Sequence, residues 1–353
     1  GCTGCNSDIA KAEKYPSREP IASRRAYSLK HNQTCSQCHA SVHEEYAGSV
    51  HANLVAEGLE EAPVCSDCHS SHSIQLRQNY HAESGEPCSK CHKEVYDAYA
   101  QSVHGKAYME GNTIRGEFVA APVCFDCHEA HDVAGTVDSE EVIAQCTSCH
   151  EVAKIAHDKW LPNAAMHMSS VSCPACHAPD TERRIDLLLF DQAEQTAAST
   201  NATVRKELDV FGETGDALSS VELWKLMRGG EGAGMPENMT LRATMKVASG
   251  AEAHLIAPRE RAVRSCESCH DRNSNAFQNV TVSISRPDGR AQRIQADSSV
   301  LSSPISVGSV GGFYAPGGTR IVLLDWLLLL AILAGLAVPV GHILLGRVVR
   351  KKK

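Results

Sequence analysis

The sequence predicts a mostly α-helical and irregular chain, with a small β-hairpin region and one transmembrane helix near the C-terminus. Three observations support this fold class. The 353 residues include sixteen cysteines and eighteen histidines, whereas aromatic residues make up only 5%. Most of the cysteines recur in one short motif, and residues 321–345 are almost entirely apolar. A chain this poor in large apolar side chains needs another source of buried apolar material.

The motif Cys-x-x-Cys-His occurs seven times and accounts for fourteen of the sixteen cysteines. In this motif the two thiols add to the vinyl groups of a heme, and the histidine that follows binds the iron. Disulfide frameworks and zinc sites also use paired cysteines, but neither requires a histidine directly after every second cysteine. The sequence therefore predicts seven covalently attached c-type hemes, with the short helices packed against them.

The predicted heme ligands follow directly from the seven motifs, which we number in chain order. The cysteines expected to form thioether bonds are Cys35, Cys38, Cys65, Cys68, Cys88, Cys91, Cys124, Cys127, Cys146, Cys149, Cys173, Cys176, Cys266 and Cys269. The motif histidines, expected to be the proximal iron ligands, are His39, His69, His92, His128, His150, His177 and His270. Because heme is attached outside the cytoplasmic membrane, we expect an exported chain whose signal peptide has been removed.

The spacing of the motifs divides the chain into segments. We expect an N-terminal segment at 1–34, a six-heme region at 35–177, an insertion at 178–265, the seventh heme with a β-hairpin at 266–297, a linker at 298–320, a transmembrane helix at 321–346 and a basic tail at 347–353. Within the six-heme region, residues 35–52 align without gaps to 88–105, and 62–74 match 121–133. The region thus contains two copies of a diheme unit, at 35–74 and 88–133.

Hydrophobic periodicity predicts a short amphipathic helix after the first motif of each copy. In the first copy apolar residues recur every fourth position, at Val42, Tyr46, Val50 and Leu54. We expect this apolar stripe to face heme.

The remaining elements are predicted from shorter patterns. Residues 182–190 and 221–227 favour helices, while 241–247 alternates like a strand. Residues 279–285 and 291–295 flank a Pro-Asp-Gly turn and predict a β-hairpin.

The apolar stretch near the C-terminus is long enough to cross a bilayer, which takes about 20 residues. The five basic residues of the tail belong in the cytoplasm by the positive-inside bias. The hemes would then lie on the periplasmic side of the cytoplasmic membrane. His342 and Asp325 lie within the span, and His342 either lines a quinone pocket or partner interface, or lies near the cytoplasmic surface without a function.

Eleven histidines lie outside the motifs, which is more than the seven needed to close the second axial position of every heme. Closed hemes transfer electrons but leave no open site for a substrate. The predicted distal ligands are His51, His72, His104, His131, His157, His167 and His254. The first four occupy equivalent positions in the two copies. His31 and His81 compete for these roles, whereas His43 is replaced by Tyr96 in the second copy and is predicted to be a surface or supporting residue.

Cys2 and Cys5 form an eighth Cys-x-x-Cys pair, but Asn6 follows in place of histidine. A disulfide or an unmodified pair is the favoured interpretation. A lipidated Cys2 and an eighth heme with a ligand from elsewhere are the alternatives. The formal net charge of −8 gives no indication of nucleic-acid binding.

Two segments resemble a known family. Tyr-x-x-Ser-Val-His-Gly at 99–105, Ala-Pro-Val-Cys-x-x-Cys-His-x-x-His at 121–131, and Gly-Thr-Arg before Leu-Asp and one membrane helix are similar to multiheme cytochrome c subunits of bc-type quinol dehydrogenase complexes. The resemblance covers roughly 35–177 and 260–350. It implies a cytochrome b-type or other quinol-oxidising membrane subunit as partner, and a soluble periplasmic cytochrome or other redox carrier as acceptor.

The favoured functional hypothesis is therefore an electron-transfer subunit with no catalytic residues and no enzyme activity of its own. A catalytic reductase for nitrite, hydroxylamine or a sulfur oxyanion is an alternative, and it needs one five-coordinate heme. A quinol dehydrogenase with its own quinone site is the other.

Overall fold

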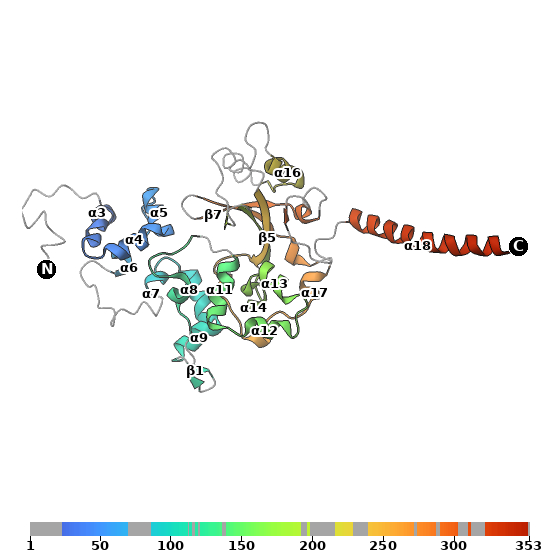
Figure 1. Cartoon of the computed structure of the whole chain (residues 1–353). Coiled ribbons are helices and arrows are strands. Elements are labelled where there is room, and N and C mark those ends of the chain that lie inside the picture. Colours follow the sequence, from blue (N-terminus) through green and yellow to red (C-terminus); the bar gives the residue numbers. More distant parts are fainter. Residues whose placement is uncertain are drawn as a thin grey trace, which may run out of the picture.

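The structure, a computed structural model, describes residues 23–69, 86–111, 113–114, 117–118, 121–135, 139–191, 196–197, 216–228, 239–271, 274–286, 290–302, 310–311 and 322–351. The chain is mostly helical, with one small mixed sheet and a long apolar helix at its C-terminal end (Figure 1). The predictions for Cys2, Cys5, His72 and His81 lie outside the described residues.

Short helices carry the first copy of the diheme unit. They are α3 (Arg24–His31), η1 (Asn32–Gln37), α4 (Ala40–Gly48), α5 (Val50–Ala56) and α6 (Cys65–His69). The single helix predicted from the apolar stripe is instead two helices, α4 and α5. Ser49 separates them because its backbone is extended, with ψ of 157°, and its Oγ accepts the Ala52 N–H as the N-cap of α5.

The second copy repeats this arrangement. It contains α7 (Glu86–Ser89), α8 (Lys93–Gln101), α9 (Val103–Met109), the two-residue strands β1 (Thr113–Ile114) and β2 (Glu117–Phe118), and α10 (Cys124–His128). Ser102 separates α8 from α9 in the same way, and its Oγ accepts the Gly105 N–H at 3.0 Å. The equivalent serines thus turn the chain at the same point of each copy.

Four helices connect the second copy to the sheet. They are α11 (Ser139–Cys149), α12 (Ala153–Asp158), α13 (Ala164–Ser170) and α14 (Cys173–His177). Asn163, which precedes α13, has a left-handed backbone with φ of 52°, a conformation that asparagine tolerates better than most residues. The Ser172 N–H donates to the Met245 carbonyl at 2.9 Å, which ties the start of α14 to the sheet.

Six strands form one mixed sheet, in the order β7-β6-β3-β5-β8 with β4 paired to β3. They are β3 (Arg183–Asp191), β4 (Thr196–Ala197), β5 (Met239–Val247), β6 (Val280–Ser285), β7 (Ala291–Ala296) and β8 (Val310–Gly311). β3 lies in the middle, antiparallel to β5 and parallel to β6. The predicted strand at 241–247, the two predicted hairpin strands and the helix at 221–227 are confirmed by β5, β6, β7 and α16 (Ser220–Arg228).

The helix predicted at 182–190 is wrong, because these residues form β3. Ile185 and Leu187 are buried on one face of the strand, and Asp186 and Leu188 are buried on the other. A short apolar run of this kind fits a buried helix and a buried strand equally well. Hydrogen bonding to β5 and β6 on its two sides decides in favour of the strand.

The main hydrophobic core lies on one face of the sheet. Ile185, Leu187, Leu241 and Val280 form its centre, with Leu223 of α16 packed in the same cluster. Among the described residues before β3, the buried apolar residues are all alanine or valine. They are Ala62, Val64, Ala98, Ala107, Val123, Ala164, Ala175 and Ala178. The protein side chains therefore supply little core to the helical part.

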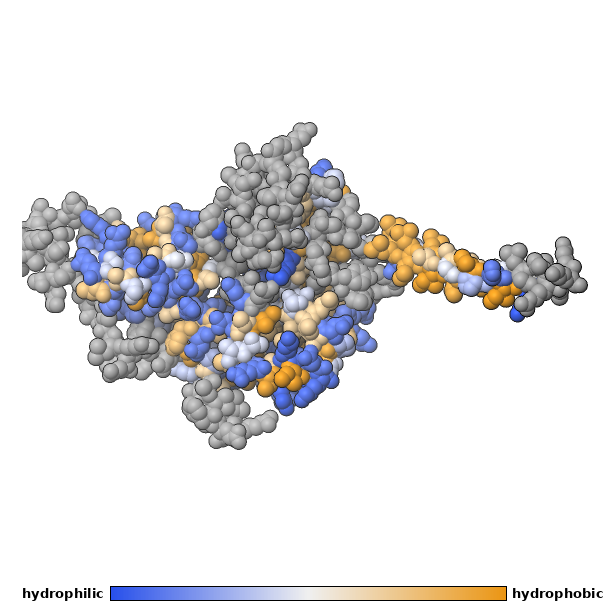
Figure 2. Space-filling view, viewed as in Figure 1, coloured by the Kyte–Doolittle hydropathy of each residue, from blue (hydrophilic) through white to orange (hydrophobic). Residues whose placement is uncertain are grey.

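The C-terminal part contains η4 (Glu252–His254), η5 (Arg259–Arg261), α17 (Glu267–His270), η6 (Asn275–Phe277), η7 (Ser298–Leu301) and α18 (Val322–Lys351). Within α18, residues Leu323–Leu344 are long and apolar enough to cross a membrane, by length and composition. None of this stretch is buried, and α18 extends away from the other helices as a hydrophobic rod (Figures 1 and 2).

Candidate heme sites

Each described motif forms a single helical turn or ends a helix. Within it, the histidine N–H donates to the carbonyl of the first cysteine at 3.0 Å in motif 1 and at 2.8 Å in motif 3, and motifs 5 and 7 have the same bond. One turn of helix brings residues three and four positions apart to the same side. The two thiols and the imidazole of a motif are therefore available to one heme.

The fourteen motif cysteines are free thiols, so they do not form the disulfide framework considered above. Within the described ranges, histidine, cysteine and acidic side chains do not gather in groups of three or more that would hold a metal ion. A structural zinc needs four such ligands. Each thiol pair instead lies next to the histidine of its own motif.

Six of the seven motif histidines face a histidine from another segment. The ring centres are 6.1 Å apart for His69 and His131, 6.3 Å for His92 and His51, 5.8 Å for His128 and His254, 6.2 Å for His150 and His104, 6.2 Å for His177 and His157, and 6.1 Å for His270 and His167. A metal bonded to two imidazoles at about 2.0 Å each holds the ring centres roughly 6 Å apart. Each pair therefore has the spacing of two axial ligands on one iron.

Three of the facing histidines are oriented by their own helical turn. The Nδ1–H of His157 donates to the Ala153 carbonyl at 2.7 Å, and that of His254 donates to Gly250 at 2.7 Å. His167 has the same bond at 3.2 Å. Because Nδ1 holds the proton, Nε2 keeps its lone pair for the metal, as in metal-ligating histidines generally.

The histidine pairs lie in surroundings that favour the neutral imidazole. Burial lowers the pKa of His51, His69, His104, His128 and His177, and the facing histidine lowers it further in each case. Only the neutral ring offers a lone pair to iron. Burial therefore holds these side chains in the form that binds metal.

The other predicted and competing histidines lie elsewhere. The His31 ring centre lies 4.2 Å from that of Tyr27, with the rings tilted by 37°, and His43 lies 6.4 Å from the Tyr46 ring. His342 is exposed on α18. Within the described ranges, no histidine ring faces His39 of motif 1. Six of the seven predicted distal histidines thus lie opposite a motif histidine, while their role as iron ligands stays a prediction.

The two copies of the diheme unit exchange histidines. His51 of the first copy faces His92 of the second, and His131 of the second faces His69 of the first. A backbone bond supports this exchange, since the Val50 N–H donates to the Val133 carbonyl at 2.9 Å. Binding a heme at either pair would therefore join the copies to each other.

The segment around His254 contacts the second copy in the same way as the segment around His131 contacts the first copy. The Val103 N–H donates to the Ile256 carbonyl at 2.8 Å, as Val50 does to Val133. In both cases the accepting residue comes two positions after the histidine. The Ala257 N–H also donates to the His177 carbonyl at 2.7 Å, which holds this segment against motif 6. Motifs 5 and 6 and this segment thus form a third unit. The segment around His254 joins it from further along the chain, after β3 and β5.

Thiols of successive motifs lie next to one another. Close thiol pairs link successive motifs, namely Cys35 with Cys65, Cys88 with Cys124, and Cys146 with Cys173. Electrostatic contacts join Cys68 to Cys88, Cys127 to Cys149, and Cys176 to Cys269. The seven motifs therefore follow each other in space in the same order as in the chain.

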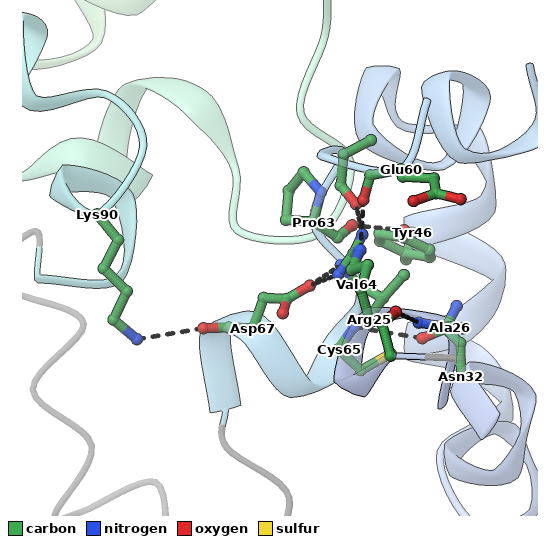
Figure 3. Close-up of polar contacts among 12 residues, drawn as sticks. Arg25, Ala26, Asn32, Tyr46, Glu60, Pro63, Val64, Cys65, Asp67 and Lys90 are labelled. Atoms are coloured by element: carbon green, nitrogen blue, oxygen red, sulfur yellow. Dashed lines mark hydrogen bonds and ion pairs between the residues drawn. The ribbon is translucent and has the colours of Figure 1, made fainter. Parts of the chain in front are cut away.

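A network of polar contacts holds motif 2 in place (Figure 3). Asp67, inside the motif, accepts the Val64 N–H at 2.7 Å and pairs with Arg25 of α3 at 2.6 Å. Arg25 also donates to the carbonyls of Glu60 and Ala62. The side chain of Lys90, inside motif 3, donates to the Asp67 carbonyl at 3.1 Å. This network fixes motif 2 relative to α3 and to motif 3.

The sequence interpretation missed a pair of tyrosines that act on the motifs. The Tyr46 hydroxyl donates to the Pro63 carbonyl at 2.8 Å, and the Tyr99 hydroxyl donates to Pro122 at 2.9 Å. Burial raises the pKa of both hydroxyls to about 12. These equivalent bonds hold the segment that leads into motifs 2 and 4. The tyrosine and the proline occupy equivalent positions in both copies, and this repetition could have predicted the contact from the sequence.

The surfaces next to the pairs suit a porphyrin. For motifs 6 and 7, the facing histidines lie on α12 and α13. The exposed Trp160 ring lies 5.9 Å from the His157 ring, and Met166, next to His167 in the chain, is exposed. Apolar side chains around a histidine pair fit a heme, which contributes a large apolar face.

Comparison with known proteins bears on this class of site. Residues 74–151 match the family of cytochrome c7 and related cytochrome c. No curated protein and no solved structure matches the chain. The match includes motifs 3, 4 and 5, and this family implies heme c as cofactor. It supports a multiheme c-type cytochrome, a class whose role is electron transfer.

Proposed function

We propose that the chain is the membrane-anchored electron-transfer subunit of a quinol-oxidising complex, with its hemes on the periplasmic side. It would receive electrons from a cytochrome b-type or other quinol-oxidising membrane subunit. It would pass them to a soluble or extracellular acceptor. When bound, hemes of this kind supply one-electron transfer without a substrate site.

The observation that carries this proposal is the set of six facing histidine pairs. With ring centres 5.8–6.3 Å apart, each pair could supply one nitrogen to each side of an iron. An iron held in this way has no open position for nitrite, hydroxylamine or a sulfur oxyanion. The contacts between successive thiols support a relay along the chain, because they bring neighbouring motifs together at every step.

The anchoring and the partner rest on α18. The helix has one stretch suited to a membrane and is followed by basic residues, which favours a cytoplasmic C-terminus. It carries a single histidine, His342, whereas a b-type heme held by two histidines needs a pair. A separate membrane subunit is therefore expected to oxidise the quinol.

The alternative catalytic function is favoured by one observation, at motif 1. Among the described residues His39 has no facing histidine, so an open heme in a reductase would lie there. The predicted ligand His72 lies outside the described residues. Electron paramagnetic resonance of the resting protein separates the two functions, since a relay gives low-spin signals only and a reductase gives one high-spin heme.

Mild detergent extraction tests the partner. A heme b protein should copurify with the full-length chain. A variant that ends before α18 should neither copurify with this partner nor be found in the membrane fraction. Copurification of quinol oxidation with the chain alone would instead support a quinone site of its own.

A further inference from the structure

Arg183, the first residue of β3, lies against motif 6. Its Nε donates to the carbonyl of Ala175, inside the motif, at 2.8 Å, and its Nη1 donates to Thr181 at 3.5 Å. Its Nη2 is buried and has no hydrogen-bond partner. The guanidinium is thus held beside the motif by two backbone carbonyls, with one nitrogen facing the interior.

The same guanidinium lies close to motif 7. Cys269 packs against the same core cluster as Ala175, whose carbonyl accepts from Arg183, and the charge of Arg183 acts on both Cys176 and Cys269. Cys176 and Cys269 are also in electrostatic contact with each other. Arg183 therefore places a permanent positive charge at the junction where the sixth and seventh motifs meet.

A positive charge at this point affects the two hemes that these cysteines would hold. Reduction of a heme adds one electron to the iron and lowers its net charge by one, so a nearby cation stabilises the reduced form. Arginine keeps its charge at every accessible pH. A partly buried charge is also screened less by solvent than an exposed one.

We propose that Arg183 is an electrostatic tuning residue that raises the reduction potentials of the hemes at motifs 6 and 7. These two hemes belong to the last two motifs before α18 in the sequence. They are then easier to reduce than they would be without Arg183. This inference rests on heme attachment at these motifs, which the proposed function shares. It does not depend on the identity of the partner or the direction of electron flow.

Arg184 provides a matched control. It is the next residue in the same strand, so its side chain points to the opposite face of β3. It is also buried, and it donates to the Ala248 carbonyl. Its electrostatic neighbours are Arg293, Asp186 and Glu252, and no motif cysteine is among them. Removing either arginine deletes a charge and its bonds to backbone carbonyls, two for Arg183 and one for Arg184, but only Arg183 lies beside the motifs.

The test is a spectroelectrochemical titration of the purified full-length chain in detergent, with small-molecule mediators and no quinol. In Arg183→Gln, two of the seven one-electron components should move to lower potential. A charge about 10 Å away across an effective dielectric of roughly 20 changes each oxidation equilibrium on the order of tenfold, and tenfold corresponds to about 59 mV for one electron. Arg183→Lys, which keeps the charge, should titrate like the wild type. Arg184→Gln should leave all components in place.

Three results would overturn the proposal. The first is an unchanged titration of Arg183→Gln. The second is an Arg183→Lys titration shifted as far as that of Arg183→Gln, because this would show that geometry matters and charge does not. The third is loss of heme, measured as pyridine hemochrome, from both Arg183→Gln and the second neutral variant Arg183→Met, which would assign the residue a structural role. Because the titration uses no partner, none of these results bears on the electron relay.

Discussion

Removal of His254 is the sharpest test of the histidine pairs. The residue lies on η4, 126 positions after His128 in the chain, yet their ring centres are only 5.8 Å apart. In His254→Ala the heme at motif 4 loses one axial ligand and becomes five-coordinate, while the other pairs are untouched. One of the seven predicted hemes, about 14% of the total, should therefore change from low spin to high spin.

Electron paramagnetic resonance and the absorbance of the high-spin charge-transfer band would measure this fraction. Added imidazole should restore the low-spin state, because it occupies the position left by the side chain. His43→Ala is the matched control, since His43 lies against Tyr46 and faces no motif histidine, and its high-spin fraction should equal that of the wild type. A His254→Ala protein with no more high-spin heme than the wild type would refute the assignment, and so would a gain of high-spin heme in the control.

Three further predictions concern the packing around the motifs. Tyr99→Phe removes the bond to the Pro122 carbonyl and should destabilise the region by about 1 kcal/mol, measured as faster hydrogen exchange in α8–α10. Both Tyr46 and Tyr99 should ionise near pH 12 when followed by phenolate absorbance, and neither should ionise near 10. Because their pKa values are raised in the folded state, the unfolded chain loses these protons first, so the free energy of unfolding should be level below pH 10 and fall between pH 10 and 12. Gly105→Ala places a Cβ 2.1 Å from the Tyr99 carbonyl oxygen and should cost about 3 kcal/mol, seen as a lower denaturation midpoint.

The sequence was sufficient for the local chemistry of the motifs. The position of His right after Cys-x-x-Cys is a covalent requirement, so it is visible in the sequence without knowledge of the fold. Counting the spare histidines and aligning the two copies also selected six side chains that the structure brings opposite motif histidines. Which motif each one faces was not predictable, because His51 and His131 cross between copies.

The sheet shows where sequence reasoning stops. Strand β3 was predicted as a helix because its apolar run has no period that separates the two structures. Its partner β5 begins 56 residues after the start of β3, and its partner β6 lies beyond motif 7. Pairing over such separations is decided by tertiary contacts. The predicted hairpin succeeded because β6 and β7 are adjacent in the chain and a turn sequence joins them.

If the chain is exported with its N-terminal part first and receives hemes at these motifs, as proposed above, the exchange of histidines between units has a consequence for its assembly. His51 precedes His92 in the chain, so the heme at motif 3 finds its second ligand already present. His131 follows His69 by 62 residues, and His254 follows His128 by 126, so the hemes at motifs 2 and 4 must wait for segments that arrive later. Until then these two hemes have an open axial position. Partly translocated chains should therefore pass through a high-spin stage that ends only when the segment carrying His254 has crossed the membrane.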